Sequence, residues 1–222
     1  MLRSEAIAEI KRGLGFRQTQ DTTIIAALKS AQEILETGRT LPSWLLVYDQ
    51  AITVTANSAN ITLPTDFLRF HDDYDLYRVD SNSTGRIFIP RRNYTEAYQA
   101  YVANGTKDDS AVIATTSSYP DVLVMRGKTA GLLIPTPTIG FTAYLTFYKK
   151  AAVLSSDVEN AWLLNNSNSL IGLAGIKVAG PLRDKGAMEL FSTQYKMGQG
   201  SFMGDIVEDE LAGRPLIMGR NN

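Results

Sequence analysis

Apolar residues recur at helical spacing near the N-terminus and predict two helices. The first covers residues 4–14 and the second runs from Asp21 to Thr37, each with an apolar stripe along one face. Gly38 stands where a helix commonly ends. We expect Ser4 to cap the first helix, and Asp21 or Thr22 to cap the second.

Helical spacing returns after Lys150. One helix is predicted to begin at the cap Ser169 and to end at Gly180-Pro181. Another follows Arg183, where apolar residues recur every three or four positions. This last helix contains four glycines, each of which costs about 1 kcal/mol relative to alanine in a helix interior: Gly186, Gly198, Gly200 and Gly204. We therefore expect the last part to fray or to gain its order from a partner, with residues 205–222 mobile in the free subunit and ordered on binding a neighbouring protein.

Between these regions the chain alternates β-branched and aromatic runs with turn residues. This composition is typical of strands and turns. One short helix, capped by Asn93 or Thr95, interrupts the run. The predicted strands are 45–55, 60–63, 75–79, 86–89, 111–115, 122–126, 130–134 and 141–148.

Neither helical end can bury its apolar stripe alone, so we expect the two ends to pack together as one bundle. The predicted fold class is α+β: a helical bundle from both chain ends with an inserted antiparallel β-rich region. The expected parts are an N-terminal helical hairpin at 1–40, the β-rich insertion at 41–155, and C-terminal helices with a tail at 156–222.

The amino-acid composition excludes several kinds of catalytic and metal site. The chain has 222 residues, no cysteine and one histidine, His71, which excludes thiol catalysis and cysteine-ligated metals. The formal net charge is -1, without the basic excess of a phosphate-gripping protein. The N-terminus lacks the apolar run of a secretion signal, and we expect a soluble protein.

Three short segments resemble chemical motifs, and a plainer interpretation is favoured for each. His71–Asp75 clusters carboxylates that a hard cation could use, but such runs commonly decorate solvated turns. Asp80–Gly85 resembles a calcium loop without its closing acid. Gly127–Thr129 ends like a phosphate loop but lacks the first glycine, so a β-turn is expected.

Basic residue pairs and three tyrosines at helical spacing could contact nucleic acid, but a structural role is favoured for both. Arg91-Arg92 with Lys107, or Lys149-Lys150, could contact phosphates, but scattered pairs usually serve solvation. The tyrosines at 94, 98 and 101 could stack bases, but at helical spacing they more often form a core or interface face.

Several segments in this order resemble a known family. A short helix (SEAIAEIKRGLG) precedes a second (TTIIAALKSAQEILETG), followed by a tryptophan segment that closes in ITLPTDFLRF. Near the end stands AWLLNNSNSLIGLAGIKVAGPLRDKGAMELFSTQYKMG. Together these resemble the head-to-tail adaptor proteins of short-tailed bacteriophages, of the tail tubular protein A type.

The resemblance implies a structural protein of the virion neck, assembled in the host cytoplasm. Its members form rings, typically dodecamers, that join the portal protein to the tail nozzle protein and let DNA pass without sequence-specific binding. Tail fibres are a further implied partner. No enzyme activity, cofactor or metal is implied. Two other functions stay open: a non-catalytic attachment module, and an enzyme using carboxylates at 71–75.

Two residue sets follow as candidates. We expect the tail to bind the portal through apolar residues flanked by arginines, namely Arg214, Leu216, Ile217, Met218 and Arg220. Three aromatic residues are expected to be structural anchors: Trp44, Phe67 and Trp162. We expect Phe67 and Leu68 to be buried where the β region meets the bundle, and the Asp66 side chain to cap a short turn.

Overall fold

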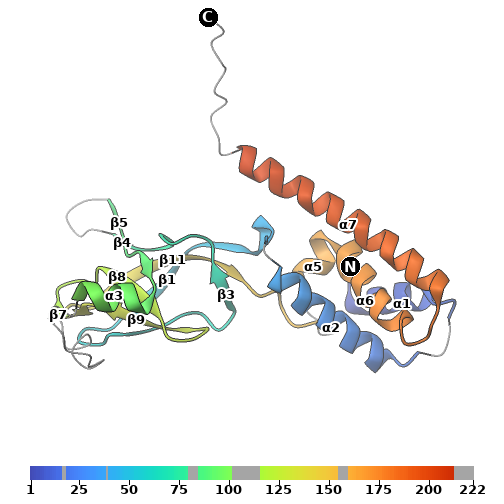
Figure 1. The fold of residues 1–222 in the computed structure, drawn as a ribbon, viewed down its shortest axis with the longest axis horizontal. Helices are drawn as coiled ribbons and strands as arrows, with labels where there is room; N and C mark the ends of the chain where they lie inside the picture. The colour runs from blue at the N-terminus through green and yellow to red at the C-terminus, as the bar shows by residue number, and fades with distance from the viewer. Residues whose placement is uncertain (17–18, 39, 80–84, 102–115, 155–159, 213–222) are drawn as a thin grey trace, which may run out of the picture. The chain divides into compact units, whose positions relative to one another are not determined.

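The structure is a computed structural model of the whole chain (Figure 1). It describes residues 1–16, 19–38, 40–79, 85–101, 116–154 and 160–212. The chain divides into two compact units. The helical unit comprises Met1–Leu45 and Ala151–Asn222, and the β unit comprises Leu46–Lys150.

The helical unit is built around one apolar helix. Its described elements are α1 (Arg3–Gly13), α2 (Asp21–Thr37), the 3-10 turn η1 (Ser43–Leu45), α5 (Ala161–Asn165), α6 (Ser167–Ala179) and α7 (Lys185–Ala212). Helix α6 packs most extensively against α7 and also contacts α1, α2 and α5. Its sequence is apolar on most sides because it is surrounded by other helices.

Helix α7 crosses α6 closely because glycines stand at the contact. A β-carbon on Gly172 would lie 2.5 Å from the backbone nitrogen of Tyr195, and one on Gly13 of α1 would lie 2.5 Å from the Phe191 ring. The fully buried Phe191 ring fills the remaining space beside Gly175. Glycine is therefore required here for close helix packing.

Three predicted caps are wrong, although the predicted helices are present. Helix α1 begins one residue before Ser4, and the Leu2 N–H donates to Glu5 Oε2 at 2.7 Å. Helix α2 is preceded by Gln20 and has no side-chain cap. Asn166, not Ser169, caps α6, because its Oδ1 accepts from the Ser169 N–H at 3.2 Å. Gly180 ends α6 as expected.

Helix α7 continues through residues 205–212 to Ala212, beyond the point where the sequence predicts fraying, and the mobility of this segment in the free subunit stays a prediction. The glycine penalty is offset at Gly198, whose backbone lies against α6. A β-carbon there would lie 2.5 Å from Ser169 Oγ, and the Gly198 carbonyl accepts from Asn166 Nδ2 at 3.1 Å. Packing therefore outweighs helix propensity at this position.

The β unit contains two main sheets. The described strands are β1 (Leu46–Val54), β2 (Asn60–Thr62), β3 (Phe67–Phe70), β4 (Leu76–Val79), β5 (Arg86–Phe88), β6 (Arg91–Arg92), β7 (Thr116–Ser117), β8 (Val122–Met125), β9 (Ala130–Ile134), β10 (Thr136–Pro137) and β11 (Phe141–Lys149). Sheet A has the order β1-β11-β4-β5, with β3 also paired to β11. Sheet B has the order β2-β9-β8-β6, and β7 pairs with β10.

Sheets A and B share one hydrophobic core. Leu76, Leu145 and Phe147 of sheet A lie in the same buried cluster as Leu123 and Leu133 of sheet B. Because both sheets contribute alternate residues to one cluster, they pack face to face as a sandwich.

The other face of sheet B is covered by the short helix α3 (Tyr94–Tyr101) (Figure 1). Ala97 and Tyr94 pack on Val122, Val124 and Leu132. Burial on both faces explains why β8 and β9 are continuous apolar runs without alternation. Asn93 caps α3 as predicted, since its Oδ1 accepts from the Glu96 N–H at 2.8 Å.

The predicted mix of helices and antiparallel sheets is confirmed, with two exceptions inside the β unit. Strand β6 pairs with β8 in parallel, and so does β7 with β10. Strands β3, β6, β7 and β10 are not predicted from the sequence, because each forms by pairing with a strand at least about 20 residues away in the chain. The strand predicted at 111–115 lies outside the described residues.

Candidate interaction surfaces

The proposed portal-binding residues of the tail cannot be placed. Arg214, Leu216, Ile217, Met218 and Arg220 all lie outside the described residues. Their role therefore stays a prediction. In the described part of the chain, no helix is long and apolar enough to span a bilayer.

The two tryptophans meet in the helical unit. Trp162 on α5 is 1% exposed, and half-buried Trp44 in η1 packs edge-on against it with ring centroids 4.8 Å apart. Asn160 caps α5 through its Oδ1, which accepts from the Trp162 N–H at 2.9 Å. Contacts between large aromatic rings stabilise a core beyond the area they bury.

A buried network of hydrogen bonds links the residues that precede α5 to helix α2. Asn160 Nδ2 donates to Gln32 Oε1 at 2.9 Å and to the Ala152 carbonyl at 2.6 Å. Gln32 Nε2 donates in turn to Glu36 Oε1 at 2.8 Å, and this oxygen also accepts from the Ala151 N–H at 3.0 Å. The network thus satisfies the backbone where the chain enters its C-terminal helices.

Phe67 lies in the core of the β unit. It is 4% exposed and packs against Phe70 and Phe147 at centroid distances of 4.9 and 5.5 Å. Leu68 is only half-buried, so the prediction that it is buried is wrong. The preceding turn is closed by the Phe67 N–H and the Pro64 carbonyl at 3.0 Å.

The acidic run at 71–75 organises a turn. Asp75 is 7% exposed, its Oδ2 accepts from the Asp72 N–H at 2.5 Å, and its Oδ1 lies 3.8 Å from His71 Nδ1. Burial raises the pKa of the Asp75 carboxyl, against the hydrogen bonds that lower it. The expected solvated loop is therefore partly wrong. Among the described residues no three potential metal ligands converge.

The two remaining motif candidates have different outcomes. Residues 80–84 of the calcium-like segment lie outside the described residues. Gly127–Thr129 forms the predicted hairpin turn between β8 and β9, where the Arg126 N–H donates to the Ala130 carbonyl at 2.9 Å. Strand β9 rather than a helix follows this turn, so no helix N-terminus is available for a phosphate.

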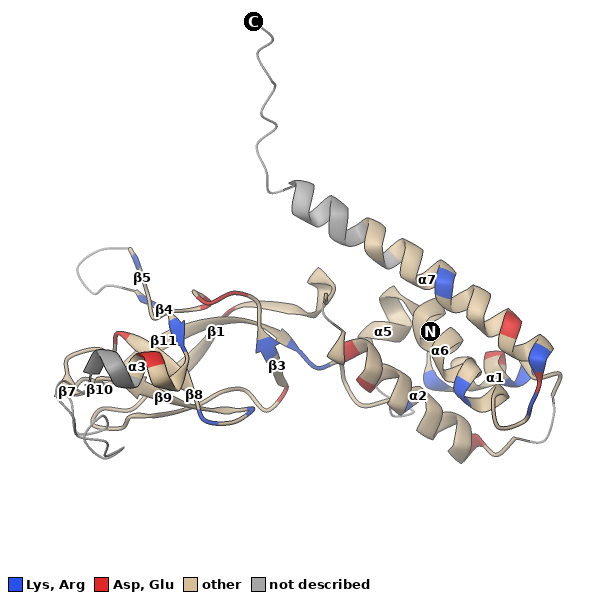
Figure 2. Ribbon diagram, in the orientation of Figure 1, with Lys and Arg blue, Asp and Glu red and all other residues tan. Residues whose placement is uncertain are grey.

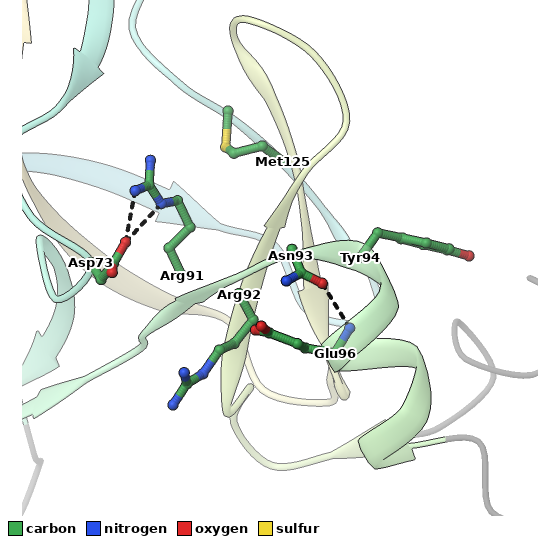
Figure 3. A pocket seen from close by; sticks show the side chains of 7 residues that line it. All are labelled: Asp73, Arg91, Arg92, Asn93, Tyr94, Glu96 and Met125. Carbon is green, nitrogen blue, oxygen red and sulfur yellow. Dashed lines mark hydrogen bonds and ion pairs between the residues drawn. The ribbon is translucent and has the colours of Figure 1, made fainter. Parts of the chain in front are cut away.

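A cavity of about 590 Å³ opens beside the start of α3 (Figure 3). Its charges balance: Arg91 donates from Nε and Nη2 to Asp73 Oδ1, at 3.1 and 2.7 Å, and Arg92 and Glu96 add one charge of each sign. Arg92 extends away from the Asp73–Arg91 pair. The lining therefore lacks the excess of positive charge that an anion site would use.

Charge and exposed apolar side chains are distributed differently. Basic and acidic residues are interspersed along the described elements of both units (Figure 2). On α7, by contrast, Leu190, Met197 and Met203 are 54%, 66% and 54% exposed. On the β unit, Ile87 and Phe88 of β5 are 39% and 48% exposed. Side chains elsewhere are equally exposed, among them Phe16, Tyr48 and Val153, so exposure alone does not identify a contact surface; the sequence pattern did not single out β5 either.

Comparison with protein families identifies the family of this chain. Residues 1–217 match the family described as SU10 adaptor protein. Comparison with curated proteins finds no matching sequence. Because the family match covers nearly the whole chain, it confirms the resemblance to phage head-to-tail adaptors, and the chain belongs to the SU10 adaptor protein family.

Proposed function

We propose that this protein is a ring-forming structural component of the virion that joins the portal to the tail nozzle and lets DNA pass through its lumen. The observation that carries the proposal is the adaptor-family match over residues 1–217. A formal net charge of -1 also suits a channel that must not hold DNA tightly. The proposed role involves no catalysis and no cofactor.

We also propose that the helices from the two chain ends form one bundle that carries the β region as an insertion, with parts close to 1–40, 41–155 and 156–222. The contacts of α6 with α1, α2 and α7 support this arrangement. The tail residues 214–220 are proposed to bind the portal. The ring is proposed to be a dodecamer assembled in the host cytoplasm, with tail fibres as a further partner.

Imaging of the full chain with and without purified portal protein tests the proposal. We expect annular particles seated on the portal, with many copies per portal and a mass to match. A monomeric free chain agrees with the proposal, because the portal can act as the template for ring assembly. A result of one or two copies per portal would contradict the ring. A free trimer that does not bind the portal would also contradict it and would favour an attachment module.

A further inference from the structure

Sheet A has two edge strands, β1 and β5, on opposite sides. Within the described ranges, neither strand pairs with another strand on its outer side. An edge strand presents unpaired N–H and C=O groups that can accept a strand from another chain. Either edge of sheet A could therefore pair with a strand of another chain.

The register shows which groups of β5 point outward. The Ile89 N–H donates to the Leu76 carbonyl of the preceding strand at 2.8 Å, and Phe88 stands opposite Tyr77. In an antiparallel ladder, bonded and non-bonded pairs alternate. The backbone groups of Arg86 and Phe88 are therefore directed away from β4, toward the free edge.

The β5 edge carries one charged side chain, Arg86, which lies across its own sheet: its guanidinium is 4.5 Å from the Tyr77 ring centroid and pairs with Asp49 of β1 at 3.2 Å. The register of β5 with β4 is regular over all three pairs. The side chains of Ile87 and Phe88 are exposed, and the exposed Tyr74 ring lies 6.3 Å from the Phe88 ring. Natural edges are commonly blunted by bulges or by charged side chains, and the Ile87-Phe88 part of this edge has neither, so it is the part that another chain could cover.

The β1 edge is protected at one end only. Its register with β11 shifts between Val47 and Gln50, around Asp49 with its φ of 54°. From Gln50 to Val54 the register is regular again. This five-residue segment is long enough to receive the three residues of β5.

The side chains of β5 and β1 fit each other on both faces of sheet A. Ile87 shares the inner face of sheet A with Ile89, and Ile52 of β1 packs on the same core. Phe88 lies on the outer face beside Tyr77, at a centroid distance of 6.0 Å. The outer-face residues of β1 are the small Ala51 and Thr53, which leave room for an aromatic ring.

We propose that β5 of one copy pairs with residues 50–54 of β1 in the next copy, so that sheet A continues from subunit to subunit. This inference rests on the proposed ring, because a head-to-tail contact between opposite edges closes into a ring when its rotation is right. Ile87 then meets Ile52 on the inner face, and Phe88 covers Ala51 and Thr53 on the outer face.

Cysteine cross-linking tests the pairing without background, because the chain contains no cysteine. The variants are Ala51→Cys with Phe88→Cys, Thr53→Cys with Phe88→Cys, and each single change. After oxidation of portal-templated rings, we expect one double variant to give a ladder of covalent oligomers larger than dimers. Rings without such a ladder would overturn the proposal, and so would dimers from Phe88→Cys alone, which indicate that β5 pairs with itself.

A matched pair of variants tests the backbone. Phe88→Ala and Phe88→Pro both remove the ring, but only proline also removes the outward N–H, a position at which an edge strand tolerates it. We expect Phe88→Pro to weaken each subunit contact about three- to tenfold more than Phe88→Ala, as one hydrogen bond allows. Both monomers should keep a similar melting temperature. Ile89→Pro is the folding control, since it removes an N–H bonded to Leu76.

Amide exchange separates this inference from the ring itself. In the ring, the Phe88 N–H should exchange at least about tenfold more slowly than in the free chain, while the Ile89 N–H is slow in both. A ring in which the Phe88 N–H stays fast would overturn the edge pairing and leave the proposed function standing. A chain that forms no ring on the portal would overturn both.

Discussion

Two glycines of α7 that stand two residues apart have opposite surroundings. A β-carbon on Gly198 would meet the backbone and Oγ of Ser169, whereas one on Gly200 would meet nothing within 4 Å. Gly200→Ala should therefore raise the free energy of unfolding by about 0.5–1 kcal/mol through helix propensity. Gly198→Ala should lower it by about 1–3 kcal/mol through overcrowding.

Urea unfolding of the two variants measures both effects, and each variant is the control for the other. Shifts of the same sign would contradict the close approach of α7 to α6. From the sequence these glycines indicated only a weak helix. The reason is that propensity can be read from a single residue, whereas the neighbour that requires glycine is 29 positions away at Ser169.

The buried carboxyl of Asp75 makes a pH prediction possible. Burial raises its pKa in the folded state, so the folded chain binds this proton more tightly than the unfolded chain does. The resulting stabilisation is fully present below the unfolded-state pKa and is lost as the pH rises through the raised one. The free energy of unfolding, taken relative to Asp75→Asn, should therefore increase as the pH falls from 7 toward 4.

Chemical unfolding of both proteins over this pH range supplies the measurement. Taking the difference removes the contribution of the other carboxyls, which are shared by the two chains. A difference that stays flat with pH, or that decreases toward acid pH, would show that the hydrogen bonds from the 71–75 turn outweigh desolvation.

At the scale of elements, caps and networks hold the short helices. Asn160→Ala should lower the free energy of unfolding by about 2–4 kcal/mol, because it removes the α5 cap and leaves buried groups of Gln32 and Ala152 without their partner. Asn165→Ala on the same helix is the matched control. Its amide makes one exposed hydrogen bond, to the Ala161 carbonyl, so a change within about 0.5 kcal/mol is expected.

Thermal and urea unfolding of the two asparagine variants checks this prediction. Equal losses would mean that the Asn160 network contributes no more than an exposed side chain does. If Gln32→Ala were to reproduce the Asn160 loss and the double variant added little to it, the two residues would act as one network.

Elements with strong local signals were predictable from the sequence, and those that depend on partners were not. The boundaries of α2 and β9 match the prediction because each carries its own apolar pattern and ends at turn residues. Strand β3 is not predicted, since Pro64 and Asp66 before it favour turns and its pairing with β11 joins residues far apart in sequence. Strand β6 has only two residues, and nothing local marks it.

At the scale of the whole molecule, the order of helix-rich and strand-rich regions indicated the α+β class and the family. The candidate surfaces were less accessible to sequence reasoning. The edge at Ile87 and Phe88 becomes recognisable only when the strand order places β5 at the end of a sheet. The burial of Trp162 and Phe67 was easier to predict, since both are large and stand in apolar runs, while their role as anchors stays a prediction.

The last prediction concerns the tail as an anchor. Helix α7 reaches Ala212, so a chain that ends there keeps every described element. The removed residues include Leu216, Ile217 and Met218 between Arg214 and Arg220. An apolar group flanked by arginines suits a crevice with an acidic rim, where the guanidinium groups can pair with carboxylates.

We expect the shortened chain to melt within a few degrees of the full chain but to bind purified portal at least about tenfold more weakly, which corresponds to about 1.4 kcal/mol. The full chain with Leu216→Ser and Ile217→Ser tests the apolar part, and Arg214→Gln with Arg220→Gln tests the charged part. Because both double variants keep the chain length, they separate loss of specific contacts from loss of the segment. If the shortened chain folds and binds portal as tightly as the full chain, the anchor is elsewhere, and the exposed apolar side chains of α7 become the next surface to test.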